Sequence, residues 1–121
     1  MALILKLENR RMGQAGKRIF NEMERNESFI FIPVMVIAEL GYLAERKKIN
    51  TTLNDAKRYF SRNKNLTIQP ITEEIIYDTF KINDIPELHD RIIAATSKNL
   101  NYELITNDPV IKSSAFINTI W

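Results

Sequence analysis

The sequence contains no cysteine, and its apolar segments are short. Without thiolates there are no disulfides and no thiolate metal sites, so a reducing cytoplasm is the expected compartment. No apolar run reaches the roughly 18–20 residues that a membrane span needs. The apolar start, residues 1–7, lacks the charged flank and cleavage site of a secretory signal. We therefore expect a cytoplasmic protein that does not associate with membranes.

Glycine and proline are also scarce, with 3 and 4 residues, and His89 is the only histidine. There is no Gly-rich phosphate loop, no serine nucleophile elbow and no Cys/His cluster, which disfavours hydride transfer and P-loop chemistry. A histidine beside a helix start is more typical of a structural or idle side chain than of a general base. No repeat or linker divides the chain, so residues 1–121 are predicted to form a single domain.

Charge is distributed unevenly along the chain. Residues 1–64 hold 13 lysines and arginines against 7 acids, whereas residues 65–121 hold 4 against 8. The net charge of +2 therefore combines a basic half with an acidic half. A polyanion can contact the first half while a cation is held in the second. Solvated helix faces are the alternative explanation of the same clusters.

Strand-like and helix-like segments alternate. Apolar strands are predicted at 29–32, 66–68, 103–106 and 116–120, and helices at 16–24, 35–46, 53–61, from 72, at 89–100 and after 108. Residues 2–8 fit either a short helix or a short strand. Alternation of this kind predicts an α/β sandwich with a mainly parallel central sheet.

Three acidic residues fall where such a sheet places its ligands, beyond the carboxyl ends of the strands. Asp108 follows the strand that ends at Thr106, Glu39 lies in the second turn of the helix after strand 29–32, and Asp90 begins the helix 89–100. Three carboxylates suit Mg²⁺ or Mn²⁺, which prefer oxygen ligands. Such an ion lowers the pKa of a bound water and neutralises charge on a phosphate. The Thr106 hydroxyl is placed to orient a carboxylate or that water.

Each acid also has a structural interpretation. Glu39, at the border of an apolar helix face, is placed to pair with Arg46. Asp90 is placed to interact with free N–H groups in the first turn of its helix, or with Arg91. Asp108, followed by proline, has the pattern of a helix cap. A carboxylate has two oxygens, so a capping role and a ligand role are compatible.

Around these acids the chain resembles the PIN-domain family, and among its members the VapC-type toxins of prokaryotic toxin–antitoxin pairs. The resemblance spans nearly the whole chain. Its most specific segment is Pro86-Glu87-Leu88-His89-Asp90-Arg91-Ile92-Ile93-Ala94-Ala95-Thr96. Weaker segments are Ile32-Pro33 with Ala38-Glu39-Leu40, then Leu104-Ile105-Thr106-Asn107-Asp108, and finally Thr119-Ile120-Trp121.

The resemblance implies a Rossmann-like, three-layer sandwich with a central first strand, usually a homodimer. It also implies a Mg²⁺- or Mn²⁺-dependent endoribonuclease that hydrolyses RNA phosphodiesters and is silenced by a cognate antitoxin protein. The second, third and fourth acids of the family fall on Glu39, Asp90 and Asp108, which makes these the expected metal ligands. The hydroxyl of the family falls on Thr106, which joins them in the expected catalytic set.

The first family acid, an Asp that ends the first strand, has no counterpart in this sequence. That strand is therefore expected to be missing or to be replaced by residues 1–7. The absence motivates an alternative, a catalytically impaired PIN-like protein that binds antitoxin or RNA without turnover. A third hypothesis is an unrelated α/β module whose acids serve only as caps and surface pairs.

Overall fold

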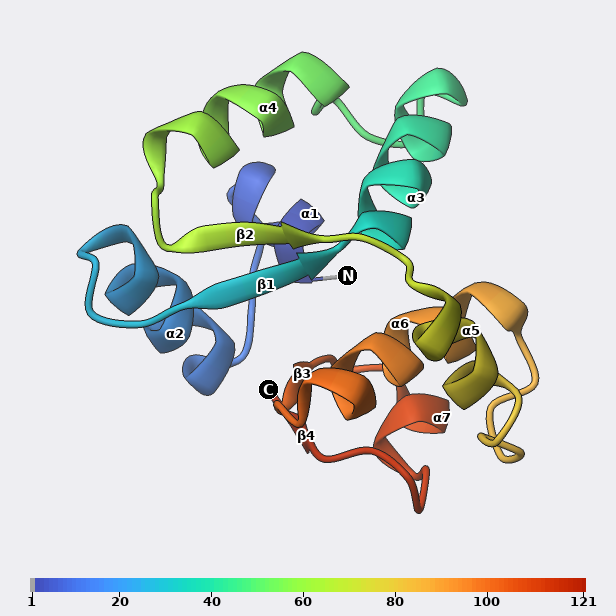
Figure 1. The fold of residues 1–121 in the computed structure, drawn as a ribbon. Helices are drawn as coiled ribbons and strands as arrows, with labels where there is room; N and C mark the ends of the chain where they lie inside the picture. The colour runs from blue at the N-terminus through green and yellow to red at the C-terminus, as the bar shows by residue number, and fades with distance from the viewer. Residues whose placement is uncertain (1) are drawn as a thin grey trace.

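The structure, a computed structural model, describes residues 2–121 and shows the predicted alternation of helices and strands (Figure 1). The elements in chain order are α1 (Ala2–Leu7), α2 (Gln14–Glu24), β1 (Ile30–Pro33), α3 (Val34–Glu45), α4 (Leu53–Arg62), β2 (Leu66–Gln69), α5 (Glu73–Thr79), α6 (Leu88–Leu100), β3 (Leu104–Ile105), α7 (Pro109–Lys112) and β4 (Thr119–Ile120). No helix in this part of the chain is long and apolar enough to cross a membrane. The predicted α/β class is confirmed.

The strands are parallel, as predicted, but they form two separate pairs. β1 pairs with β2, with Ile30 opposite Leu66, and β3 pairs with β4, with Leu104 opposite Thr119. Within residues 2–121 each pair is a two-stranded sheet, and no strand joins β1 to β3. In Figure 1 the two pairs lie apart, with helices around each of them. The predicted central sheet is thus divided between β1 and β3.

Residues 2–7 form a helix, so the alternative that residues 1–7 supply a strand is wrong for these six residues. Met1 lies outside the described residues. Three consecutive side chains, those of Ala2, Leu3 and Ile4, are buried, whereas a strand buried on one face alternates. The Lys6 ammonium also lies 3.2 Å from the Glu24 carboxylate of α2. These contacts hold the segment as a helix against α2.

Side-chain caps begin several helices where the sequence predicts them. The Thr52 hydroxyl accepts the Asp55 N–H at 3.1 Å, and the Asp55 carboxylate accepts the Thr52 N–H at 2.9 Å, which is a capping box for α4. Thr72 caps α5 by accepting the Ile75 N–H at 3.2 Å. Each cap satisfies an N–H group that the helix leaves unpaired. The capping residues in the sequence therefore predict where α4 and α5 begin.

The last strand is shorter than the predicted 116–120, because the chain before it is bent and anchored. The Asp84 carboxylate accepts the Ser114 hydroxyl and the Ala115 N–H, each at 2.8 Å. Ile117 is buried against α5, α6 and α7 instead of extending the strand. Only residues 119–120 remain to pair with β3.

The apolar core has two parts. The larger part packs α1, α2, α3 and α4 around β1 and β2, with Met23 and Leu40 fully buried. The smaller part lies among α5, α6 and α7 and includes Ile75 and Ala94. The side chain of Leu104 packs against both parts. The two clusters support the two strand pairs and leave the space between them less filled.

Gly13 lies just before α2, at a point where the backbone closely approaches Trp121. A Cβ at this position would lie 2.4 Å from the Trp121 carbonyl oxygen, which accepts the Gly16 N–H at 2.8 Å. Gly13→Ala is therefore expected to lower the free energy of unfolding by about 1–3 kcal/mol, measured by urea denaturation. The matched control is Gly41→Ala, whose Cβ would meet only the Leu53 side chain, at 3.3 Å. Equal losses in the two variants would contradict the predicted clash.

Candidate metal site

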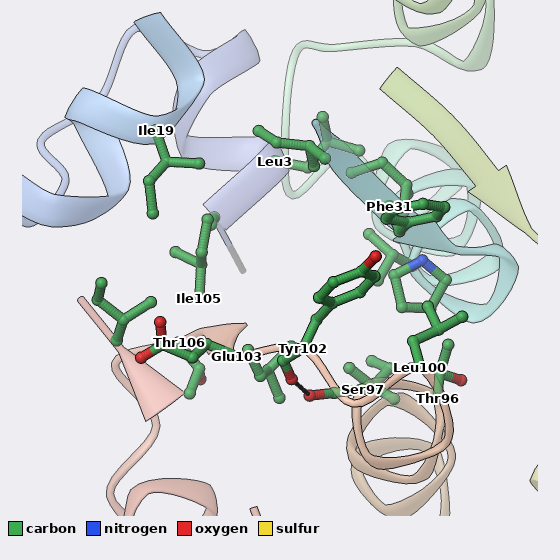
Figure 2. Close-up of a pocket in the computed structure, with 18 of the residues that line it drawn as sticks. Leu3, Ile19, Phe31, Thr96, Ser97, Leu100, Tyr102, Glu103, Ile105 and Thr106 are labelled. Carbon is green, nitrogen blue, oxygen red and sulfur yellow. Dashed lines mark hydrogen bonds between the residues drawn. The ribbon is translucent and has the colours of Figure 1, made fainter. Parts of the chain in front are cut away.

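A cavity of about 810 Å³ lies between the two strand pairs, and we call it the slot. Its walls include β1 on one side and Leu104, Ile105 and Thr106 on the other. Figure 2 shows Leu3 of α1 and Phe31 of β1 across the space from Ile105 and Thr106. Most of the residues that line it are apolar.

All three predicted metal ligands line the slot. Glu39 comes from the second turn of α3, Asp90 from the first turn of α6, and Asp108 from the loop after β3. Glu103 is the fourth acid in the lining, and no lysine or arginine of the described chain joins it. The fold thus brings together carboxylates that are far apart in sequence, in a slot whose charged lining residues within residues 2–121 are all acidic.

The carboxylates influence one another electrostatically. Burial raises the pKa of Glu39 above its ordinary value, and the negative charge of Asp90 raises it further. Burial likewise raises the pKa of Asp90, with added repulsion from Glu87 and Asp108. Carboxylates that lose hydration and repel each other hold protons more tightly. A bound cation relieves both effects, so the electrostatics of the site favour one.

The two arginines that the structural interpretation pairs with Glu39 and Asp90 contact other side chains. The Arg46 guanidinium donates to the Tyr42 hydroxyl at 3.2 Å and lies 5.5 Å from the centre of its ring. Arg91 lies over the Phe80 ring, 5.4 Å from its centre. Neither arginine forms an ion pair with Glu39 or Asp90 in residues 2–121. The surface-pair interpretation of these two acids therefore lacks support.

Asp108 has the capping role that the sequence predicts. Its Oδ1 accepts the N–H groups of Val110 at 2.9 Å and Ile111 at 3.3 Å, and thereby begins α7. The Thr106 hydroxyl accepts the Asp108 N–H at 3.1 Å and stabilises the turn between β3 and α7. Thr106 thus positions Asp108. The orientation of a ligand or a water by Thr106 stays a prediction.

The three acids share the slot, but within residues 2–121 they do not converge on one point. In the described part of the chain, no group of three or more His, Asp or Glu side chains is close enough to hold an ion. Their chemistry nevertheless fits a hard divalent cation, because the three acids offer carboxylate oxygens and no basic side chain of residues 2–121 lines the slot. Glu39, Asp90 and Asp108 would hold the ion, which would activate a water and neutralise a phosphate.

Glu87 contributes to the site but was not singled out from the sequence. Its carboxylate caps α6 by accepting the Asp90 N–H at 2.7 Å, and it lies 3.5 Å from His89 Nδ1. The cap fixes the first turn of α6, from which Asp90 enters the slot. Its position three residues before Asp90 was the available signal, but glutamate is a less common N-cap than Ser, Thr, Asp or Asn.

An aromatic contact across the slot was also missed. The Phe31 and Tyr102 rings stack with centroids 5.3 Å apart and an interplanar angle of 17° (Figure 2). The Ser97 hydroxyl donates to the Tyr102 carbonyl at 2.6 Å and anchors the chain just before β3. Because the rings are 71 positions apart in sequence, no local sequence pattern reveals their contact.

Comparison with known proteins places this geometry in a family. The model of the PIN domain matches residues 3–117. The chain therefore belongs to the PIN domain family, which confirms the sequence resemblance. The fold is similar to that of a chain in the crystal structure of VapBC2 from Rickettsia felis bound to a DNA fragment from their promoter. That match has a TM-score of 0.70 and 16% identity, and it covers 99% of this chain and 93% of the other. No curated protein matches the sequence significantly.

The raised pKa of Glu39 predicts a pH-dependent effect of its charge. Above the folded-state pKa, the ionised carboxylate destabilises the native protein, and the penalty disappears as pH falls below the ordinary value of 4.5. Without added metal, Glu39→Gln is expected to raise the melting temperature at pH 7 but not at pH 4. Scanning calorimetry at both pH values checks this, with the exposed Glu45→Gln of the same helix as control. A gain for E39Q that is equal at both pH values would contradict it.

Proposed function

We propose that the protein is a VapC-type endoribonuclease toxin that hydrolyses RNA phosphodiesters with Mg²⁺ or Mn²⁺. Glu39, Asp90 and Asp108 hold the ion, and Thr106 positions Asp108 beside it. The observation that carries the proposal is that these three acids, from three separate elements, line one slot that no basic side chain of residues 2–121 lines. Membership of the PIN domain family supports it, as does the mutual repulsion of the carboxylates.

Partners follow from the same proposal. The similar VapBC2 chain belongs to a complex, and this supports a cognate antitoxin protein as the partner of the present chain. We further propose a homodimer that acts in the cytoplasm on RNA.

Basic side chains of the first half are proposed to contact RNA phosphates. Lys17, Arg18 and Arg25 line a shallow hollow of about 310 Å³ along α2, together with the amides of Gln14 and Asn21. Exposed cations beside amide groups suit a phosphate backbone.

Removing two of these charges is expected to weaken RNA binding in a salt-dependent way. The slope of log K against log salt is negative, and each lost phosphate contact on a single strand reduces its magnitude by about 0.7, so Lys17→Gln with Arg18→Gln reduces it by about 1.4. Fluorescence anisotropy with a labelled single-stranded RNA at several salt concentrations measures this. The control is Lys48→Gln with Lys57→Gln, which removes two exposed cations outside α2. An equal change in the control would exclude a special role for α2.

The nuclease is tested by titrating Mn²⁺ into the protein with a labelled single-stranded RNA. Cleavage that rises with Mn²⁺, saturates, and stops in excess EDTA supports the proposal. Full activity in EDTA would contradict the metal mechanism.

A second candidate is a PIN-like protein that binds RNA or antitoxin without turnover. It is favoured by one observation, namely that the three acids do not converge into an ion-holding group within residues 2–121. In the same titration this candidate predicts saturable RNA binding with no cleavage at any Mn²⁺ concentration.

A further inference from the structure

Asp84 joins two loops in the part of the chain that carries Asp90 and Asp108. Its Oδ1 accepts the Ser114 hydroxyl and its Oδ2 accepts the Ala115 N–H, each at 2.8 Å, and we call this pair of hydrogen bonds the latch. Because Asp84 and Ser114 are 30 positions apart in sequence, the latch is a tertiary contact and not a turn. It connects the loop that leads into α6 with the loop that follows α7.

On one side, the latch is tied to α7. The Ser114 N–H bonds the Ile111 carbonyl at 3.1 Å, and the Ser114 hydroxyl also accepts the Phe116 N–H at 3.2 Å. The helix α7 has only four residues, and the Asp108 carboxylate accepts the N–H groups that begin it. Because such a helix is about one turn long, it moves as one piece, and a shift of Ser114 is passed on to Asp108.

On the other side, the latch is tied to the start of α6. Asp84 precedes Asp90 by only six positions. Between them, the Ile85 side chain is buried in the smaller core, and Pro86 fixes one backbone angle. Glu87 then accepts the Asp90 N–H at 2.7 Å. A constrained segment of this length leaves Asp90 little freedom to move independently of Asp84.

The Asp84 carboxylate neither pairs with a basic side chain of residues 2–121 nor lines the slot. The Ala115 N–H and the Ser114 hydroxyl hold the pKa of Asp84 below its ordinary value, so the side chain is ionised at neutral pH. Hydrogen bonds to an ionised acceptor are stronger than those between neutral groups. The charge of Asp84 therefore strengthens the latch.

The separation of Asp90 and Asp108 matters for the candidate metal site, because the acids of residues 2–121 do not form an ion-holding group by themselves. We propose that Asp84 is a positioning residue, which sets this separation through the latch. Asp84 contacts neither the ion nor RNA and acts through the starts of α6 and α7. The expected effect on Mn²⁺ rests on the proposed metal site, whereas the effect on the two helix starts does not.

The first test needs no metal. Asp84→Ala (D84A) removes both hydrogen bonds of the latch, and amide hydrogen exchange of the metal-free chain is followed by NMR. We expect exchange about tenfold faster at Asp90 and at Ile111, whose amides bond to the side-chain caps of α6 and α7. Faster exchange confined to Ala115, which loses its own hydrogen bond, would overturn the proposal.

Ser114→Ala is a milder variant and serves if D84A does not fold. It removes one of the two hydrogen bonds of the latch and leaves the bond to the Ala115 N–H. We expect faster exchange at the same two amides, by a smaller factor than in D84A. Unchanged exchange at both amides would likewise overturn the proposal.

Glu8→Ala (E8A) is the matched control. The Glu8 carboxylate accepts the N–H groups of Asn50 at 3.2 Å and Thr51 at 3.0 Å, together with the Thr51 hydroxyl. It thereby joins the end of α1 to the loop between α3 and α4, and its truncation also removes one negative charge. We expect E8A to lower the midpoint of urea denaturation, as D84A does, without faster exchange at the starts of α6 and α7. Equal acceleration there in E8A would show a general loss of stability and would overturn the proposal.

The second test uses Mn²⁺. D84A is expected to weaken Mn²⁺ binding about tenfold in a calorimetric titration. Excess Mn²⁺ is expected to restore RNA cleavage by D84A to the wild-type rate, but not cleavage by Asp90→Asn, which loses a ligand. Substoichiometric Mn²⁺ is expected to broaden the amide signals of Asp90 and Asp108 together in E8A but unequally in D84A.

Two outcomes separate this proposal from the proposed function. Unchanged Mn²⁺ affinity in D84A, with binding intact in the wild type, would overturn the positioning role of Asp84. A wild type that binds no Mn²⁺ among the three acids would instead contradict the proposed function. The metal-free exchange would then decide whether the latch positions the two helix starts.

Discussion

Replacement of Asp90 by asparagine (D90N) is expected to abolish Mn²⁺-dependent RNA cleavage and to weaken metal binding on the order of 100-fold. Asp90 has the central electrostatic position in the slot. Its charge raises the pKa of Glu39, and its own pKa is raised by burial, by Glu87 and by Asp108. Asparagine keeps the shape of the side chain but removes the negative charge. The substitution therefore isolates the effect of the charge, because it creates no cavity. Calorimetric titration with Mn²⁺ and an RNA cleavage assay measure the two effects.

The control for D90N is Asp55→Asn. Asp55 also lies in the first turn of a helix and completes the capping box of α4, outside the slot. The substitution is expected to leave metal affinity and cleavage unchanged. If D90N were less stable than the wild type without metal but retained its affinity for Mn²⁺, the acid would be structural and the proposed metal site wrong.

Truncation of Leu40 to alanine (L40A) is expected to lower the free energy of unfolding by about 2–5 kcal/mol. Leu40 is 0% exposed and packs in the larger core. Its neighbour in α3 is Glu39, so the same packing that stabilises the domain holds one side of the candidate site. Because domains of this size are stable by only about 5–15 kcal/mol, the loss is a large fraction of the total. Urea denaturation followed by Trp121 fluorescence measures it.

Leu53→Ala is the matched control for L40A. The side chain of Leu53 is 49% exposed at the start of α4. Its truncation removes the same atoms but leaves no enclosed cavity, and we expect a loss below about 1 kcal/mol. A loss of similar size in both variants would show that Leu40 is not a core position.

The local structure was largely predictable because short-range chemistry determines it. Thr52, Thr72 and Asp108 are side chains that cap helices, and each begins the expected helix. The apolar face of α3 likewise includes its buried residues, Val36 and Leu40, whereas α6 buries six consecutive residues, 92–97. Sequence patterns that span only a few residues were therefore sufficient to predict most helices and strands.

For residues 2–7, the local sequence pattern does not decide between a helix and a strand. A run of apolar residues around Lys6 fits a buried strand as well as a buried helix, and tertiary contacts such as the ion pair with Glu24 decide between them. The division of the sheet is of the same kind. No pattern within β1 or β3 reveals which edge stays unpaired, because pairing depends on the whole chain.

For the candidate site, the residue types and their positions at strand ends predicted which acids share one cavity. Their spacing in that cavity was not predictable, and neither was the cap from Glu87 that fixes the start of α6. Both depend on the angles at which α3 and α6 meet the strands. A sequence pattern does not define such angles.

The most direct test of the metal site is paramagnetic broadening of the amide NMR signals by Mn²⁺. Mn²⁺ broadens signals close to where it binds. We predict that substoichiometric Mn²⁺ broadens the signals of Glu39, Asp90 and Asp108 together and that D90N removes the effect. Broadening centred on acids outside the slot, such as Glu22 and Glu24, or a pattern unchanged in D90N, would contradict the assignment of these three acids to one metal site.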